Sequence, residues 1–166
     1  MFKTKAINEV PPRAYSDFCC DIEKLDTYLH RYAKNNHKKG VGKTFLLLKE
    51  ERAIGFYTIS MAGVEFNKLP AKIQAGIPKH PIPVARIGRL AVDKEFKSKG
   101  FGKFLLLDAL ARIVEASRVV AAYCVVVDAK NEEVAKFYAH FGFQASKDDA
   151  LCLFLPISSI LGLDFS

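Results

Sequence analysis

The sequence predicts a single α/β domain, residues 1–166, in which a mixed and mostly antiparallel sheet carries helices on both faces. The length is enough for one compact core and leaves little room for a second. Apolar residues follow the order helix, antiparallel strands, then strand–helix–strand–helix–strand. Half of the residues are apolar and 26% are charged, which is typical of a globular domain and excludes a disordered chain.

The first half of the chain predicts one helix followed by a hairpin. Apolar side chains recur at helical spacing after Asp21, and the helix becomes strongly basic before Gly40 ends it. Thr44–Lys49 and Ala53–Val64 are predicted as strands, and the polar turn Glu50–Arg52 joins them as an antiparallel hairpin.

The second half predicts strands that alternate with helices. A short amphipathic segment, Asn67–Ile77, and a proline-rich loop that extends to Pro83 precede the strand Val84–Val92. The elements predicted after it are a basic loop at Lys94–Lys103, a buried helix at Phe104–Ala116, a β-branched strand at Val119–Val127, a helix at Asn131–Phe141 and a last strand at Leu151–Leu155.

The charge and the cysteines limit the classes of partner. A formal net charge of +7 favours anions such as nucleotide phosphates or nucleic acid, although solubility alone also accounts for it. Cys19 and Cys20 are adjacent while Cys124 and Cys152 stand alone, so no pair has metal-ligand spacing and no metal is expected.

The N-terminal residues give no sign of a targeting segment. They lack the apolar core of a signal peptide, and no apolar run in the chain reaches the roughly 18–20 residues that cross a bilayer. We therefore expect a cytoplasmic protein that does not bind a membrane.

The basic loop predicts a pyrophosphate site. A strand leads into a loop that holds Gly100 and Gly102 and then opens a helix, whose first backbone N–H groups lack intrahelical partners. Glycines allow a phosphate to approach the backbone, and neighbouring lysines add positive charge. The alternative is an ordinary surface loop with solvated lysines.

The same loop resembles a family signature. Lys97–Gly102 resembles the (Arg/Gln)-x-x-Gly-x-(Gly/Ala) sequence of the GNAT acetyltransferases, with Lys97 where Arg or Gln is usual. A later helix of that family is matched by Asn131, Ala135, Phe137, Tyr138, Gly142 and Phe143. The resemblance implies a GNAT fold, with a sheet splayed at the cofactor site, and acetyl-CoA as acyl donor. The donor contacts that it implies are Leu90, Ala91, Val92, Lys97, Ser98, Lys99, Gly100, Phe101, Gly102, Lys103 and Asn131.

A finer resemblance extends from about Phe18 to Pro156. The segments Phe18–Cys20, Gly55–Ser60 and Gly88–Asp93 look like those of a GNAT branch of bacterial toxins encoded beside ribbon-helix-helix antitoxins, with Cys20 in place of the usual glycine. The resemblance implies acetylation of the α-amino group of aminoacyl-tRNA, which inhibits translation. It also implies a homodimer and a ribbon-helix-helix antitoxin as partner.

Tyr138 is the candidate catalytic residue, by resemblance to the family tyrosine at this position. A phenol with an ordinary pKa near 10 is protonated at neutral pH and can donate to the CoA thiolate as it leaves. The alternative is an aromatic side chain packed in the core, as we expect for Phe137 and Phe141.

The sequence offers no obvious general base. A lysine amine with a pKa near 10.4 is almost fully protonated at cellular pH, whereas a free α-amine has a pKa near 8. This absence favours an aminoacyl ester over a protein lysine as the acceptor, with water taking the proton.

Basic side chains form a candidate tRNA surface. Lysine and arginine contacts to phosphate position RNA without reading its sequence. The candidates are Arg31, Lys34, Lys38, Lys39, Arg86 and Arg89, and the alternative for each is a solvated side chain. His30 and His37 are expected at the surface of the same region.

Two other functions remain open at this point. One is a GNAT enzyme that acetylates a small amine or a protein N-terminus through the same donor site. The other is a catalytically silent acyl-CoA-binding regulatory module.

Overall fold

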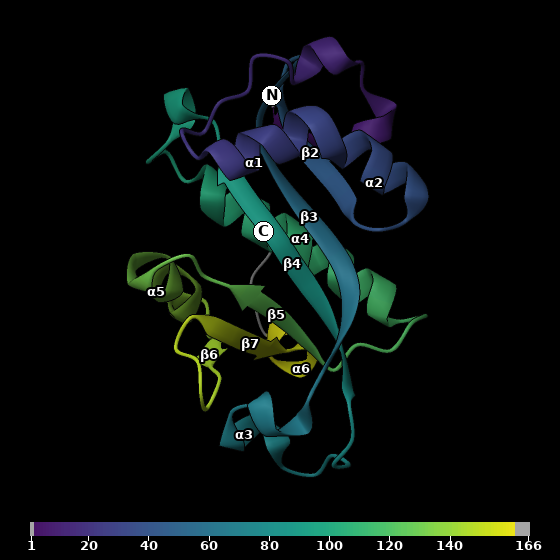
Figure 1. Ribbon diagram of the computed structural model, residues 1–166, viewed down its shortest axis with the longest axis vertical. Coiled ribbons are helices and arrows are strands. Elements are labelled where there is room, and N and C mark those ends of the chain that lie inside the picture. The colour runs from purple at the N-terminus through teal and green to yellow at the C-terminus, as the bar shows by residue number, and fades with distance from the viewer. Residues whose placement is uncertain (1, 162–166) are drawn as a thin grey trace. The chain divides into compact units, whose positions relative to one another are not determined.

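The computed structural model of the chain describes residues 2–161, and their elements follow in mixed α/β order (Figure 1). The strands are β1 (Phe2–Ala6), β2 (Lys43–Lys49), β3 (Arg52–Val64), β4 (Ile82–Val92), β5 (Cys124–Asp128), β6 (Gln144–Ala145) and β7 (Cys152–Pro156). The α-helices are α1 (Glu23–Thr27), α2 (Ala33–Lys39), α3 (Ala71–Gln74), α4 (Phe101–Ser117), α5 (Glu132–His140) and α6 (Ile157–Ile160). Short 3-10 turns lie at Ile7–Glu9, Pro12–Ala14, Phe66–Lys68 and Lys94–Phe96, and a π-helical turn, Tyr28–Tyr32, joins α1 to α2.

The described strands form a seven-stranded sheet in the order β1-β2-β3-β4-β5-β7-β6. The pairs β1–β2, β2–β3, β5–β7 and β6–β7 are antiparallel, and β4–β5 is parallel. The predicted mixed and mostly antiparallel sheet is therefore confirmed. Within residues 2–161, no helix combines the length and the apolar character that crossing a bilayer requires.

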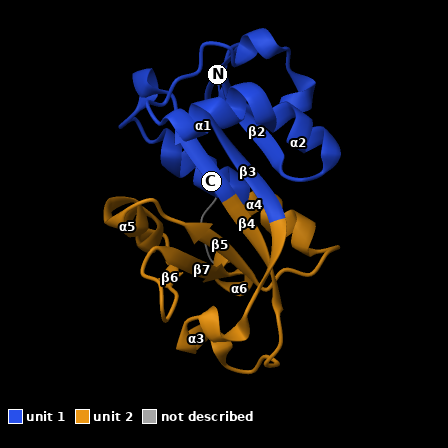
Figure 2. Cartoon of the chain, viewed as in Figure 1, with its two compact units in different colours: residues 1–60, 88–109 blue, residues 61–87, 110–166 orange. Residues whose placement is uncertain are grey.

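The chain divides into two compact units, residues 1–60 with 88–109 and residues 61–87 with 110–166 (Figure 2). Strands β3 and β4 and helix α4 each contribute residues to both units. The assignment of the whole chain to a single domain stays a prediction.

In the first unit, helices cover both faces of the sheet. Leu29 and Ala33, in and just after the π-helical turn, pack with Leu46 and Phe56 in one apolar core. Gly55 precedes Phe56 in β3 and so faces the opposite side. A Cβ at Gly55 would lie 2.9 Å from Cδ1 of Leu105 in α4, so this glycine permits the close approach of that helix.

The second unit has its own core around β5. Val84, Cys124, Val126 and Phe154 pack together with residues of the α3 region such as Ile73. The phenol of Tyr123 donates to the Ile73 carbonyl oxygen at 3.0 Å, which holds α3 to the start of β5.

Several predicted elements are confirmed and others need correction. The hairpin is present, and the first helical region ends at Gly40 in a left-handed conformation with φ 76°. The strand predicted over Val119–Val127 begins only at Cys124, because Val119 and Val120 follow the end of α4 and are 88% and 56% exposed.

Helix α4 and strand β1 also differ from the sequence prediction. Helix α4 begins at Phe101, so Gly102 and Lys103 belong to its first turn instead of a loop. The short amphipathic segment expected over Asn67–Ile77 contains the end of the 3-10 turn Phe66–Lys68 and the short helix α3. Strand β1 was not predicted, because its lysines give it a polar composition, although it pairs with β2 along its full length.

Candidate active site

The loop between β4 and α4 has the backbone of an anion cradle. Ser98 and Gly100 both have positive φ, 63° and 87°, and a Cβ at Gly100 would meet nothing within 4 Å. The first intrahelical bond of α4 runs from Phe104 N–H to the Gly100 carbonyl oxygen at 3.2 Å. The amides of residues 101–103 precede it and are available to an anion. We call Lys97–Lys103, which the sequence predicts to bind the acyl donor, the donor loop.

The lysines of the donor loop differ in what their side chains do. Lys97 Nζ donates to the Cys20 carbonyl oxygen at 2.8 Å, so its side chain ties the loop to the segment before α1. Lys99 Nζ lies 5.7 Å from the ring centroid of Phe96, and Lys103 is exposed at the start of α4. Lys97 therefore supports the loop, and Lys99 and Lys103 are the two other lysines that the loop offers to an anion.

The end of β4 presents backbone groups at its second edge. Asp93 N–H donates to the Ile54 carbonyl oxygen of β3 at 2.8 Å. Because backbone groups alternate in direction along a strand, those of Leu90 and Val92 point away from β3. The β4–β5 ladder pairs Val84 to Ile87 and does not include these two residues. Leu90 and Val92 can thus bond an extended ligand.

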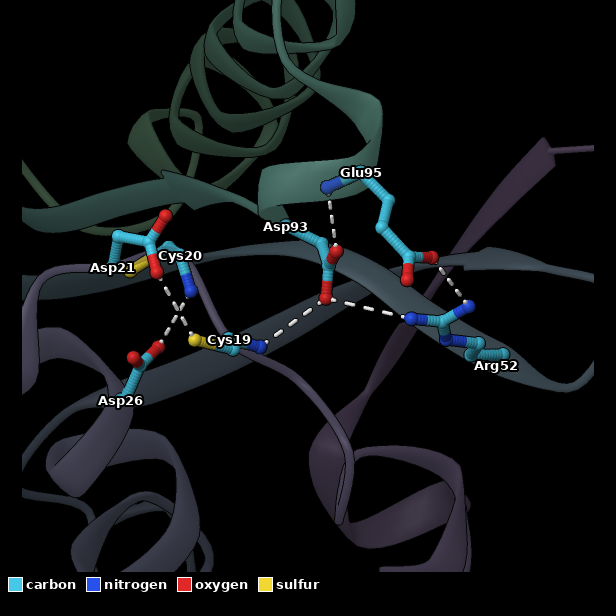
Figure 3. A network of polar contacts seen from close by, with 7 residues as sticks. All are labelled: Cys19, Cys20, Asp21, Asp26, Arg52, Asp93 and Glu95. Carbon is cyan, nitrogen blue, oxygen red and sulfur yellow. Dashed lines mark hydrogen bonds and ion pairs between the residues drawn. The ribbon is translucent and has the colours of Figure 1, made fainter.

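Asp93 follows Val92 and is 1% exposed. Its carboxylate accepts the Glu95 N–H at 2.9 Å and the Cys19 N–H at 3.2 Å, and Arg52 Nη2 lies 3.7 Å away (Figure 3). Asp93 was not predicted as a site residue, although it closes the Gly88–Asp93 segment. Its contact with Cys19 joins residues 74 positions apart, which no local pattern reveals.

Tyr138 lies in α5, within the second unit. Its side chain is 6% exposed and packs edge-on against Phe137 and Phe143, with ring centroids 5.2 and 5.4 Å away. Burial raises the pKa of the Tyr138 phenol to about 12. The phenol therefore keeps its proton at every physiological pH. The packing of Tyr138 is that of a core aromatic residue, and its protonation state is that of a proton donor. Both interpretations of Tyr138 therefore stay open.

Asn131 caps the helix that carries Tyr138. Its side-chain oxygen accepts the Val134 N–H at 2.9 Å, and this bond fixes the first turn of α5. The side-chain oxygen of Asn131 is thus already hydrogen-bonded within α5. A contact between Asn131 and the acyl donor stays a prediction, and it would involve the side-chain NH₂.

The basic surface predicted on the first helical region is present. Arg31, Lys34, Lys38 and Lys39 are all exposed. A pocket of about 400 Å³ lies among them, lined by Pro12, Tyr15, His30, Arg31, Lys34, Asn35 and Lys38. Within the described residues, Arg31, Lys34 and Lys38 have no ion-pair partner, so the pocket carries three uncompensated positive charges. We call this the basic pocket.

The two arginines of β4 behave differently from the helical cations. Arg86, in the second unit, forms an ion pair with Asp128, which neutralises much of its charge. Arg89, in the first unit, is half-buried and lies over the ring of Tyr28. Arg86 is therefore less available to bind a phosphate than Arg31, Lys34 or Lys38.

His37 is buried, so its prediction as a surface residue was wrong. Its Nδ1 accepts the Thr44 N–H at 3.0 Å, which links the end of α2 to the start of β2. Burial, followed by the charge of Lys43, lowers the pKa of His37. His30 is exposed and lines the basic pocket, as expected for a surface histidine.

The predicted site residues fall into two sets. The donor loop, Leu90, Ala91, Val92, Arg89 and the basic pocket belong to the first unit, whereas Arg86, Asn131 and Tyr138 belong to the second. Within the part of the chain that the structure describes, no three His, Cys, Asp or Glu side chains are arranged to hold a metal.

Residues 7–143 match the acetyltransferase (GNAT) family, and this match covers more than half of the chain. The chain belongs to the GNAT acetyltransferase family. One relative, the tRNA-acetylating toxin of Mycobacterium tuberculosis (strain ATCC 25618 / H37Rv), is 34% identical over 150 residues, which cover 87% of this chain and 90% of the relative.

Solved structures agree with this assignment. A tyrosine-to-phenylalanine mutant of KacT is 28% identical, with a TM-score of 0.87 over 98% of this chain and 99% of that chain. AtaT complexed with acetyl-methionyl-tRNAfMet is 26% identical, with a TM-score of 0.86 over 97% and 98%. AtaTR bound with AcCoA is 25% identical, with a TM-score of 0.78 over 96% of both chains. The predicted GNAT fold is confirmed.

Proposed function

We propose that this GNAT enzyme is a toxin that transfers an acetyl group from acetyl-CoA to the α-amino group of aminoacyl-tRNA and so inhibits translation. The observation that carries the proposal is the similarity to a tRNA-acetylating toxin over nearly the full length of both proteins. The donor loop and the basic pocket would supply the two kinds of surface that this reaction needs, one for a diphosphate and one for RNA.

Acetyl-CoA fits the donor loop on structural grounds. The positive φ at Gly100 and the open space beside it let a diphosphate reach the first amides of α4. Lys99 and Lys103 would add charge, while Leu90 and Val92 would offer backbone bonds to the pantetheine arm and polarise the thioester carbonyl. AtaTR, a structural relative, has been solved with the same donor.

The reaction needs an unprotonated amine. The amine nitrogen attacks the thioester carbonyl, the new C–N bond forms, and the C–S bond breaks as the thiolate leaves. An α-amine with a pKa near 8 is partly unprotonated at cellular pH, so no dedicated base is required.

Tyr138 would hold the proton that the leaving sulfur needs. With a pKa raised to about 12, the phenol is a weaker acid than a thiol, whose ordinary pKa is near 8.5. Tyr138 would therefore donate a hydrogen bond to the sulfur as the C–S bond breaks, and would give up the phenol proton only as it is replaced by the proton that the amine loses on becoming an amide, which water would carry. The phenol is regenerated in the same turnover, and the proton balance closes.

The basic pocket would hold the acceptor tRNA. Three cations without carboxylate partners on one helical surface favour phosphate, and such contacts carry no sequence information. We extend the proposal to a homodimer in the cytoplasm that a ribbon-helix-helix antitoxin neutralises, on the resemblance of Phe18–Cys20 and Gly88–Asp93 to that toxin branch.

The test offers the purified enzyme radiolabelled acetyl-CoA with charged tRNA, uncharged tRNA, polyamines and peptides in separate reactions. Label in charged tRNA alone is expected. Transfer to peptide or polyamine only would replace the substrate with a small amine or a protein N-terminus. Donor binding without transfer to any acceptor would indicate a silent regulatory module.

A matched pair of variants tests the tRNA surface. Lys34→Glu with Lys38→Glu should weaken tRNA binding at least tenfold and flatten its salt dependence, because two phosphate contacts are lost. The same charge change at Lys72 and Lys79, exposed residues of the second unit, should have little effect. Equal losses from both pairs would show that net charge alone attracts the RNA.

A further inference from the structure

The segment before α1 is bonded to the chain around the donor loop at several points. Lys94 N–H donates to the Cys19 carbonyl oxygen at 2.8 Å, and Lys97 Nζ donates to the Cys20 carbonyl oxygen at 2.8 Å. Cys20 N–H in turn donates to Asp26 in α1 at 2.9 Å (Figure 3). Cys19 and Cys20 thus connect α1, through hydrogen bonds, to the residues that lead into the donor loop.

Asp93 is the buried hydrogen-bond acceptor at the end of this connection. One carboxylate oxygen accepts the Cys19 N–H and the other accepts the Glu95 N–H, which caps the 3-10 turn Lys94–Phe96. The Asp93 N–H also closes the β3–β4 ladder on Ile54. A single buried residue therefore marks the end of β4 through its backbone N–H and sets, through its carboxylate, the direction in which the chain enters the donor loop.

We propose that Asp93 is a positioning residue for the donor, which sets the diphosphate-binding amides of the donor loop through its bonds to Cys19 and Glu95. The inference rests on the donor site of the proposed function but not on the identity of the acceptor. Asp93 itself, 1% exposed and fully bonded, does not contact the donor.

The sign of one substitution separates positioning from electrostatics. Asp93→Asn removes a negative charge near a tetra-anionic donor, so an electrostatic role alone predicts tighter binding. A positioning role predicts weaker CoA binding. The side-chain NH₂ of Asn would face the N–H of either Cys19 or Glu95, and that hydrogen bond would be lost. Donor binding would then have to restore the loop geometry that this bond sets, and a cost equal to one hydrogen bond to a charged group corresponds to an increase in Kd of about tenfold.

Glu95 provides the matched control. Its carboxylate is exposed and bonds Arg52 at 3.1 Å, while its backbone N–H remains capped by Asp93 in the variant. Glu95→Gln removes the same charge two residues away and should leave CoA affinity unchanged or slightly tighter. Asp93→Ala, which removes both acceptor oxygens, should weaken it more than Asp93→Asn.

The experiment titrates the full chain with CoA by calorimetry and measures kcat and KM with acetyl-CoA and with acetyl-pantetheine, which lacks the diphosphate. We expect Asp93→Asn to raise the Kd for CoA and the KM for acetyl-CoA about tenfold, with kcat and the acetyl-pantetheine rate unchanged. Equal losses with both donors would reduce Asp93 to a general structural role and overturn the proposal, as would unchanged or tighter CoA binding.

A measurement on the wild-type chain covers the case in which the variants fail to fold. The amides of Cys19 and Glu95 should be protected from hydrogen exchange in the free protein, and exchange as fast as in an open loop would contradict the proposal. If the wild type binds CoA but acetylates no aminoacyl-tRNA, the proposed function fails while the role of Asp93 stands.

Discussion

The guanidinium of Arg89 lies over the ring of Tyr28, with Cζ 3.5 Å from the ring centroid. The Tyr28 hydroxyl accepts a hydrogen bond from Asn36 Nδ2 at 3.3 Å. The π-helical turn is therefore attached to β4 through Arg89 and to α2 through Asn36. Arg89 precedes Leu90, so the stack joins the helical region of the basic pocket to the strand segment predicted to bind the donor.

A double-mutant cycle should detect this stack. Tyr28→Leu and Arg89→Ala are each expected to destabilise the protein, and the double variant should lose about 1 kcal/mol less than their sum, because a half-buried cation–π pair is lost only once. Denaturant unfolding of the four proteins measures the coupling. Strictly additive losses would mean that the stack contributes nothing to stability.

Gly100→Asp should abolish donor binding, since it places a side chain and a negative charge where the diphosphate is proposed to lie. Gly76→Asp is the matched control, because Gly76 has φ +80° and the same open surroundings in the second unit. Both variants carry the strain of a non-glycine residue at positive φ, about 1 kcal/mol. Calorimetry with acetyl-CoA should show no detectable binding for Gly100→Asp and wild-type affinity for Gly76→Asp.

Tyr138→Phe should lower turnover about a hundredfold without changing donor affinity, since the ring stays and only the proton donor is lost. Tyr123→Phe is the control in the same unit, because it removes a hydroxyl that bonds Ile73 and should cost only about 1 kcal/mol of stability. An unchanged kcat for Tyr138→Phe at saturating acetyl-CoA and charged tRNA would leave Tyr138 as a packing residue.

The pH profile of turnover gives a second readout for Tyr138. With its pKa raised to about 12, the phenol stays protonated throughout the range in which the protein can be assayed. We expect kcat/KM to rise through the pKa of the acceptor amine, which the adjoining ester keeps below the value near 8 of a free α-amine, and then to level off. A falling limb between pH 8 and 10 would contradict a buried, protonated Tyr138.

His37 should make the stability of the first unit depend on pH. Its pKa is lowered in the folded chain, so below about pH 6.5 the unfolded state binds a proton that the folded state does not. The free energy of unfolding should therefore fall with decreasing pH, by up to about 1.4 kcal/mol per pH unit, until the pH reaches the folded-state pKa. His37→Gln should remove this slope, while His30→Gln, at an exposed position, should not.

The sequence predicts the parts of the protein whose signals are local. The hairpin follows from two apolar runs around a polar turn, and the loop between β4 and α4 follows from its glycines, its lysines and the strand before it. The burial of His37 could not be predicted, because it depends on a bond to Thr44 N–H that forms only when α2 packs beside β2. Val119 and Val120 show the opposite error, since β-branched residues were assigned to a strand from composition alone.

The role of Asp93 could not be predicted for a related reason. An aspartate at the end of a strand is usually a solvated residue or a helix cap, and one sequence does not say which amide it meets. The contact with Cys19 is made 74 positions away and depends on how the chain returns across β3 and β4. Long-range pairings of this kind arise from tertiary packing and leave no periodic signal in the sequence.

The π-helical turn Tyr28–Tyr32 has a consequence for the basic pocket that composition does not reveal. This turn contains one more residue than an α-helical turn would. The extra residue determines which side chains of α2 face the interior, because it rotates α2 about its axis relative to α1. A chain one residue shorter here would keep its overall charge yet rotate α2 by about 100°. Ala33 and His37 would then leave the interior while lysines were driven toward it. The electropositive character of this surface therefore depends on a single inserted residue as well as on how many lysines the helix contains.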